Sequence, residues 1–214
     1  LRIRDVIPNT PAAQERHRLE PGEVIRTIDG QAVGSDTRLA RVLTGPADEP
    51  VRQEVVGTDG KERTVELRAT SFGSARANLY DAWLEHEREM VETLSEGRLG
   101  YLHVRGMNWS SFERFEAELV KVGHGKDGLI IDVRDHGGGF TTDHLLTVLT
   151  QPRHAVTVPR GGGPGYPQDR MVYARWDKPI VVLCNQNSFS NAEIFAHAVQ
   201  MLDRGQVVGT PTAG

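Results

Sequence analysis

The stretch that decides the fold is residues 128–140, GLIIDVRDHGGGF. Its first part, 128–133, is mostly apolar and β-branched, which predicts a buried strand. The glycines at 137–139 break that strand, and a helical stretch is predicted over 142–149. Because glycine allows close backbone approach and unusual dihedrals, the N–H groups of this loop can point at an anion.

A second strand, loop and helix follow further along the chain. The hydrophobic run 180–184, IVVLC, leads into 185–195, NQNSFSNAEIF, and puts Ser190 at the start of a predicted helix. A hydrolase presents a nucleophile in this way, with the hydroxyl beside the free N–H groups of the helix start. Serine is also a preferred N-cap residue, so these residues alone leave a purely structural role for Ser190 open.

The two loops together predict an acyl-transfer site. Ser190 would attack a carbonyl, and the backbone donors of the glycine loop would stabilise the oxyanion that forms. The competing interpretation of the glycines is a phosphate cradle. It is weaker, because the run has neither the G-x-x-x-x-G-K-[ST] nor the G-x-G-x-x-G spacing.

Four motifs carry a family resemblance. They are GRLGYLHVRGM (97–107), DGLIIDVRDHGGGF (127–140), NQNSFSNAEIF (185–195) and GTPTAG (209–214). In this order and spacing they resemble the tail-specific and tricorn-type serine proteases of the S41-like superfamily, and the tricorn branch most. The resemblance implies a peptidase that degrades oligopeptides in the cytoplasm, needs no cofactor and forms a homo-oligomer as a full-length protein.

The resemblance also implies roles for individual residues. Ser190 matches the nucleophile, Gly139 the glycine whose N–H lines the oxyanion hole, and Asn191 the second N–H donor. Asn191 stands where the family often has Asp, an exchange that a backbone donor tolerates. Gly138 and Thr157 are the predicted substrate-binding residues. Archaeal members select basic side chains with an acidic residue near Thr157, and threonine cannot supply that charge.

The general base is expected outside this chain. In tricorn-type enzymes a histidine before the PDZ-like domain is the base, and an acidic residue well beyond the nucleophile helix completes the tetrad. In the processing branch the base is a lysine that would fall at or past Gly214. The chain is therefore expected to be truncated at both ends and inactive by itself. Two alternatives stay open: a Ser-Lys carboxy-terminal processing protease, and a non-catalytic PDZ-containing scaffold.

The histidines and the cysteine give no base and no metal site. His197 follows Ser190 on the same predicted helix at about 10 Å, from a rise of ~1.5 Å per residue, which is beyond hydrogen-bond reach. His136 and His144 are interpreted as surface or supporting residues. The sequence lacks the H-E-x-x-H pattern, and the single Cys184 predicts neither a metal cluster nor a disulfide.

Three regions are predicted, in an α/β fold. Residues 1–70 resemble a PDZ domain, 71–98 form a linker helix, and 99–214 form an incomplete crotonase/ClpP-like catalytic subdomain. The PDZ-like region is predicted to have a turn at 29–30, a short helix at 39–43 and a strand pair, 51–56 with 63–68. The catalytic part alternates strands and helices, which predicts a largely parallel sheet covered on both faces. Its predicted elements are strands 99–104, 128–134, 179–184 and 207–209 and helices 110–122, 142–149 and 190–203, after a linker helix at 77–95.

Composition and the remaining loop set further limits. The chain has 25 basic and 29 acidic residues, a net charge of −4, and no basic stripe, which argues against nucleic acid as a partner. No apolar run approaches the roughly eighteen residues of a membrane span, so no membrane partner is expected. The segment 151–170 is rich in Gly and Pro and predicts an irregular loop that shapes the substrate cleft, with Arg160 and Tyr166 as candidates.

Overall fold

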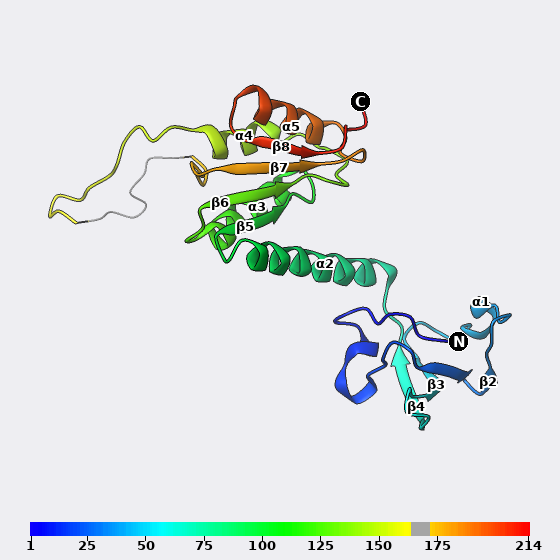
Figure 1. Ribbon diagram of the computed structural model, residues 1–214. Coiled ribbons are helices and arrows are strands. Elements are labelled where there is room, and N and C mark those ends of the chain that lie inside the picture. Colours follow the sequence, from blue (N-terminus) through cyan, green and yellow to red (C-terminus); the bar gives the residue numbers. More distant parts are fainter. Residues whose placement is uncertain (164–171) are drawn as a thin grey trace. The chain divides into compact units, whose positions relative to one another are not determined.

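The computed structural model describes residues 1–163 and 172–214 (Figure 1). The chain divides into two compact units, Leu1–Glu85 and His86–Gly214. Helix α2, Phe72–Leu94, contributes residues to both. Among the described residues, no helix combines the length and the apolar character needed to cross a membrane.

The first unit is built on an antiparallel sheet in the order β2-β1-β3-β4. The turn between β1 and β2 consists of Asp29 and Gly30, whose φ values of 48° and 77° suit the predicted two-residue hairpin. Strands β3 and β4 pair along their whole length, as the sequence predicts. A small apolar core is formed by Leu19, Val55 and Val65. The elements are η1 Pro11–Ala13, η2 Glu15–His17, β1 Val24–Ile28, β2 Gln31–Ala32, α1 Leu39–Val42, β3 Pro50–Val56 and β4 Glu62–Arg68.

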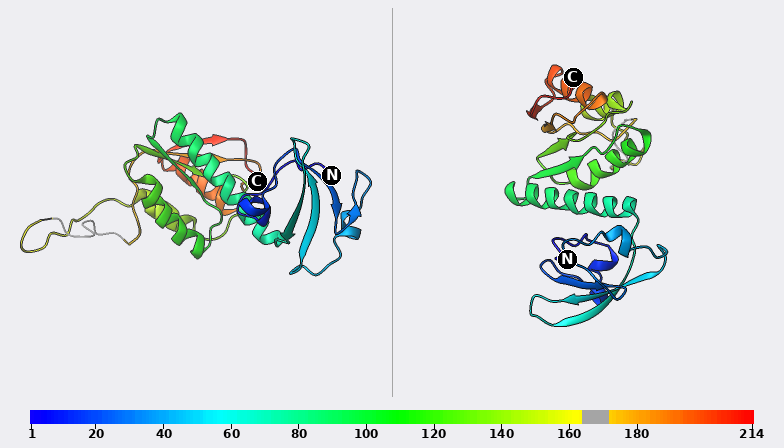
Figure 2. Two further views of the ribbon diagram at one scale, coloured as in Figure 1. Left: turned by 90° about the horizontal axis from the view of Figure 1, so that it is seen from below. Right: turned by 90° about the vertical axis from the view of Figure 1, so that its right-hand side faces the viewer.

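The second unit is built on a parallel sheet whose strands follow one another in chain order, β5-β6-β7-β8. Each strand is joined to the next by a helix, as parallel pairing requires. Figure 2 shows this sheet and its helices from two further sides. The elements are β5 Leu99–His103, α3 Trp109–Gly123, β6 Gly128–Asp132, α4 Thr142–Thr150, β7 Ile180–Cys184, α5 Asn191–Met201 and β8 Gln206–Gly209.

The helices that join the strands do not divide between the two faces of the sheet. Leu102, Ile131 and Val182 point to one face, where they share a core with apolar side chains of α3, α4 and α5. These three helices therefore all cover one face, and among the described helices only α2 contributes to the predicted cover of the other. Right-handed crossovers that advance in one direction along a sheet place all their helices on the same side. On the other face, the α2 carboxylate of Glu87 pairs with Arg134 at 3.3 Å.

That other face is polar at its centre. Asp132 is fully buried, and it accepts hydrogen bonds from Tyr101 Oη at 2.5 Å and from Arg134 Nε at 2.8 Å. Burial, and then the Asp132 hydrogen bond, raise the pKa of Tyr101, so the phenol remains a donor. A buried carboxylate is tolerated because these donors satisfy it. The end of β6 is thereby fixed at the point where the glycine loop begins.

Helix α2 begins at Phe72, within the predicted linker 71–98 and five residues before the amphipathic stretch predicted from 77. The hydroxyl of Ser71 accepts the N–H of Ser74 at 3.0 Å, which satisfies one of the unpaired donors of the first turn. The sequence interpretation overlooked this capping serine. The other helices of the second unit begin within one residue of the prediction.

Candidate active site

Ser190 occupies the sharp turn between β7 and α5. Its φ of 56° and ψ of −122° lie outside the extended region that an N-cap residue normally adopts. A non-glycine residue held in such a conformation stores strain, and capping a helix does not require it. Strain at the residue between a strand and a helix is the geometry that exposes a nucleophilic serine.

The residues before Ser190 are tied to the end of β6. Ser188 is fully buried, and its hydroxyl donates to the Val133 carbonyl at 2.8 Å. The side-chain amides of Asn185 and Asn187 donate to the Asp135 carboxylate at 3.1 and 2.7 Å. These bonds, that of Asn187 first, hold the pKa of Asp135 below its usual value. The two predicted loops are thus joined through buried and surface hydrogen bonds.

The glycine loop lies directly against Ser190. Gly138 has a φ of 91°, and a Cβ there would lie 2.7 Å from Ser190 Cβ and 2.9 Å from the Asn191 nitrogen. Gly139 has a φ of 151°, and a Cβ there would run into the Met107 carbonyl. Only glycine fits both positions. The scaffold alternative would be favoured if this loop and Ser190 were far apart, and that condition is not met.

Two backbone N–H groups at this contact are unpaired. The neighbouring N–H groups are used: Gly138 donates to His136 Nδ1 at 2.7 Å, and Phe140 donates to the Met107 carbonyl at 2.7 Å. Within the described part of the chain, the N–H groups of Gly139 and Asn191 have no hydrogen-bond partner. Asn191 also begins α5, where the helix dipole favours negative charge. Such a pair of donors is suited to an oxyanion.

The peptide plane before Gly139 has a defined orientation. The Gly138 carbonyl accepts the Met107 N–H at 3.4 Å. In a trans peptide the carbonyl and the following N–H point in opposite directions. The Gly139 N–H therefore points away from the Met107 backbone, which leaves it open to a ligand.

Ser190 also takes part in capping α5. The Glu193 carboxylate accepts the Ser190 N–H at 2.5 Å and the Gly214 N–H at 2.9 Å. These bonds, that of Gly214 first, lower the pKa of Glu193. Glu193 is the third residue of the helix, which gives the capping-box arrangement. The N-cap interpretation of Ser190 therefore coexists with its strained, partly exposed geometry.

The histidines take different places. His136 is only 1% exposed and is bonded to both loops, so of the two expected roles, surface or supporting, the structure gives it the supporting one. Burial lowers the pKa of His136. His144 Nδ1 lies 2.9 Å from Tyr173 Oη, and His197 is exposed on α5. Among the described residues, no group of three or more His, Cys, Asp or Glu side chains is placed to hold a metal ion.

The residues predicted to bind substrate in the loop 151–170 are exposed where the structure describes them. Thr157 is exposed, in a described stretch that forms no helix or continuous strand, and Arg160 is exposed as well. Tyr166 lies outside the described residues. The roles of Thr157 and of Gly138 in binding substrate remain predictions.

An aromatic group beside the glycine loop was overlooked in the sequence. Phe140 follows Gly139 and is 60% exposed, and its ring lies 6.2 Å from that of Trp109, which is 49% exposed. The Trp109 ring also packs on His144 at 4.6 Å. The sequence could have indicated this aromatic group, because Phe140 directly follows the last glycine of the loop.

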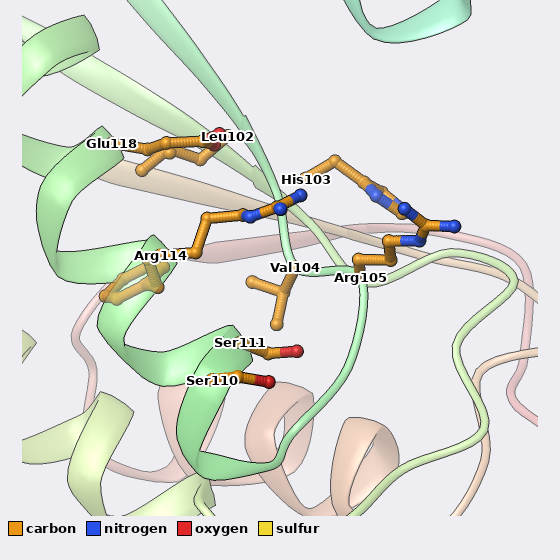
Figure 3. Close-up of a pocket in the computed structure, with 9 residues that line it drawn as sticks. Leu102, His103, Val104, Arg105, Ser110, Ser111, Arg114 and Glu118 are labelled. Atoms are coloured by element: carbon orange, nitrogen blue, oxygen red, sulfur yellow. The ribbon is translucent and has the colours of Figure 1, made fainter. Parts of the chain in front are cut away.

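A separate cavity of about 230 Å³ lies where the chain leaves β5 and enters α3 (Figure 3). Ser110, Ser111 and Arg114 project from α3 toward the segment after β5. The lining of this cavity includes none of the predicted site residues. The cavity is therefore distinct from the contact between Ser190 and the glycine loop.

Comparison with known proteins places the second unit in a family. A model of peptidase family S41 matches residues 98–214. Tricorn protease homolog 1 of Streptomyces coelicolor is 32% identical over 206 residues, which cover 96% of this chain and 19% of that protein. The tricorn protease of Thermoplasma acidophilum is 29% identical over 90% of this chain and 17% of its own length.

A solved structure and a second branch of relatives are also similar. The crystal structure of the tricorn protease matches with a TM-score of 0.68 and 26% identity, covering 95% of this chain and 19% of that chain. A carboxyl-terminal-processing protease of Synechocystis is 28% identical over the whole of this chain and 49% of its own length. The chain spans about a fifth of the tricorn relatives that it matches.

Proposed function

This chain belongs to peptidase family S41, and we propose that it carries the nucleophile and the oxyanion hole of a tricorn-type serine peptidase. The observation that carries the proposal is the contact between the Gly138 backbone and Ser190, with two unpaired N–H groups beside it. A strained serine, a helix start and glycines that admit no side chain are together what acyl transfer needs.

In the proposed mechanism, the Ser190 hydroxyl attacks a peptide carbonyl and forms a tetrahedral intermediate. The N–H groups of Gly139 and Asn191 donate to its oxyanion, and Asn191 adds the field of the helix start. A general base takes the Ser190 proton and returns it to the leaving amine. His136 is not that base, because its Nδ1 accepts the Gly138 N–H and its ring is buried.

We propose that the base is supplied by another part of the full-length protein. A histidine would give the tricorn mechanism and a lysine the processing mechanism. The tricorn relatives support the first, with 32% identity for the Streptomyces protein against 28% for the processing protease from Synechocystis. On this basis the substrates are oligopeptides, the site of action is the cytoplasm and the full-length protein is a homo-oligomer.

The test is peptide hydrolysis by the full-length protein on a mixed library of short peptides. Ser190→Ala should reduce kcat at least about a thousandfold, as loss of a nucleophile does elsewhere. Ser110→Ala, at an exposed serine of the same unit, is the matched control and should retain activity. If Ser190→Ala retains wild-type activity, Ser190 is not the nucleophile.

Longer polypeptides, assayed beside the short-peptide library, distinguish the two peptidase branches. A tricorn-type enzyme should cleave short peptides, whereas a processing protease should cleave only the carboxy-terminal tails of longer chains. Cleavage confined to such tails would favour the Ser-Lys alternative.

A further inference from the structure

His136 connects the two loops of the proposed site by two of its own atoms. Its Nδ1 accepts the N–H of Gly138 at 2.7 Å. Its backbone carbonyl accepts the N–H of Phe189 at 2.9 Å. Gly138 precedes the proposed oxyanion donor Gly139, and Phe189 precedes Ser190. One residue therefore restrains the chain on both sides of the space where a carbonyl would be attacked.

The bond to Gly138 requires a particular form of the imidazole. A nitrogen that accepts an N–H must carry a lone pair, so Nδ1 is unprotonated and the ring proton lies on Nε2. If Nδ1 were protonated, its N–H would face the Gly138 N–H, and the hydrogen bond would be lost. Burial is the largest influence on the pKa of His136 and lowers it, which favours the neutral ring, although the Gly106 backbone acts in the opposite direction.

A packing role alone does not account for a histidine here. Its Nε2 is buried and makes no hydrogen bond of good geometry among the described residues, although the Gly106 backbone lies near the ring. A buried polar atom without a full hydrogen bond destabilises the folded state, and an apolar side chain of similar size would avoid that loss. The Nδ1 acceptor is the property that such a side chain would lack.

We propose that His136 is a positioning residue: by holding Gly138, it orients the Gly139 N–H toward the place beside Ser190 where the oxyanion would form. The glycine loop is then held from two sides. Met107 bonds to Gly138 and Phe140 on one side, and His136 bonds to Gly138 on the other. The inference rests on the proposed function, since it assigns His136 to the geometry of that same oxyanion hole.

The test compares two substitutions that separate the acceptor from the volume. Asparagine keeps an acceptor for the N–H two residues on, because its side-chain oxygen forms an Asx-turn. Leucine keeps the volume and has no acceptor. In the full-length protein, His136→Asn should retain kcat within about threefold, while His136→Leu should lose about 10- to 100-fold, the scale of a misplaced oxyanion donor. KM should change little in either.

The reverse order would overturn the inference. If His136 only fills space, His136→Leu should equal or exceed His136→Asn in kcat. Hydrogen exchange of the peptide that contains residues 137–140 gives a readout independent of catalysis. It should be faster in His136→Leu than in the wild type, and unchanged in His136→Asn; equal exchange in all three would also contradict the inference.

Two further variants keep the outcomes separate. If His136→Leu does not fold, His136→Gln replaces it, because its longer side chain misplaces the acceptor while remaining polar, and it should lose kcat as well. Ser190→Ala is measured in parallel. An inactive Ser190→Ala beside a fully active His136→Leu would contradict only the role of His136, whereas an active Ser190→Ala would contradict the proposed function itself.

Discussion

Ser190 has a backbone conformation, φ 56° and ψ −122°, that glycine adopts more readily than any other residue. A residue held in such a region stores about 1–3 kcal/mol, which the surrounding structure must offset. Two hydrogen bonds hold the turn in place: the Ser190 N–H donates to Glu193 after it, and the Ser188 hydroxyl before it donates to the Val133 carbonyl. If the strain serves catalysis, its removal should stabilise the protein and abolish its activity.

Two substitutions at this position measure the strain. Ser190→Gly should be more stable than Ser190→Ala by about 2 kcal/mol, because glycine alone relaxes at positive φ and is also the better N-cap residue. At an unstrained N-cap the difference would stay below about 1 kcal/mol. Chemical denaturation of the 214-residue chain gives the difference. Equal stability of the two variants would show that the turn is not strained.

The glycine loop offers a matched pair of substitutions. Gly138→Ala would place a methyl group 2.7 Å from Ser190 Cβ at a φ of 91°, whereas Gly137→Ala meets nothing within 4 Å. We expect Gly138→Ala to reduce kcat by about 100-fold or more through displacement of the oxyanion donors. Gly137→Ala should stay near wild type. The assay is peptide hydrolysis by the full-length protein; equal activity of the pair would remove Gly138 from the site.

The sequence predicted these individual residues unevenly. Ser190, Gly139 and Asn191 were expected from motifs, and the structure places Gly138, the neighbour of Gly139, against Ser190 and Asn191. His136 could not be interpreted in this way, because its importance depends on a bond between its ring and a backbone N–H two residues later. No spacing in the sequence distinguishes that bond from a surface histidine.

At the scale of elements, the link between β6 and the nucleophile loop is partly ionic. The Asp135 carboxylate accepts the amides of Asn187 and Asn185, which lower its pKa. A depressed pKa means that this stabilisation is complete above the ordinary value near 4 and is lost as the pH falls through the lower folded pKa. The stability of the second unit should therefore decline below about pH 4.

A single substitution tests this pH dependence. Asp135→Asn removes the titrating group and should flatten the decline in stability between about pH 4 and pH 2. Urea denaturation at several pH values is the measurement, with Asp143→Asn, at an exposed carboxylate in the first turn of α4, as the control. An unchanged acid slope in Asp135→Asn would mean that other carboxylates set it.

The elements themselves were largely predictable. Apolar runs gave every strand of the parallel sheet to within two residues. The amphipathic pattern of α2 begins at 77, later than the helix itself, because the capping Ser71 precedes that pattern. The side of the sheet that the helices cover depends on strand order, and that order is a property of the tertiary fold.

At the scale of the whole molecule, the two units differ in their cores. Three buried side chains form the core cluster of the first unit, whereas twenty of the described residues form that of the second. Stability scales with buried apolar area, so the first unit should open at a lower free energy than the second.

Hydrogen exchange can follow each unit separately. Val55→Ala should speed exchange in the first unit, and Phe195→Ala should speed it in the second, by removing side chains that are 1% and 0% exposed. The expected loss of stability is about 2 kcal/mol for the valine and about 3–5 kcal/mol for the phenylalanine. A wild-type first unit that exchanges more slowly than the second would contradict this ranking of the cores.

The central claim concerns the chemistry of one hydroxyl, and covalent labelling tests it directly. A fluorophosphonate should react with the full-length protein at the tryptic peptide 176–204, and fragmentation should assign the adduct to Ser190 rather than to the buried Ser188. Ser190→Ala should not be labelled there, and Gly138→Ala should be labelled more slowly. An adduct on another residue, in a protein whose Ser190→Ala variant still hydrolyses peptides, would contradict the account.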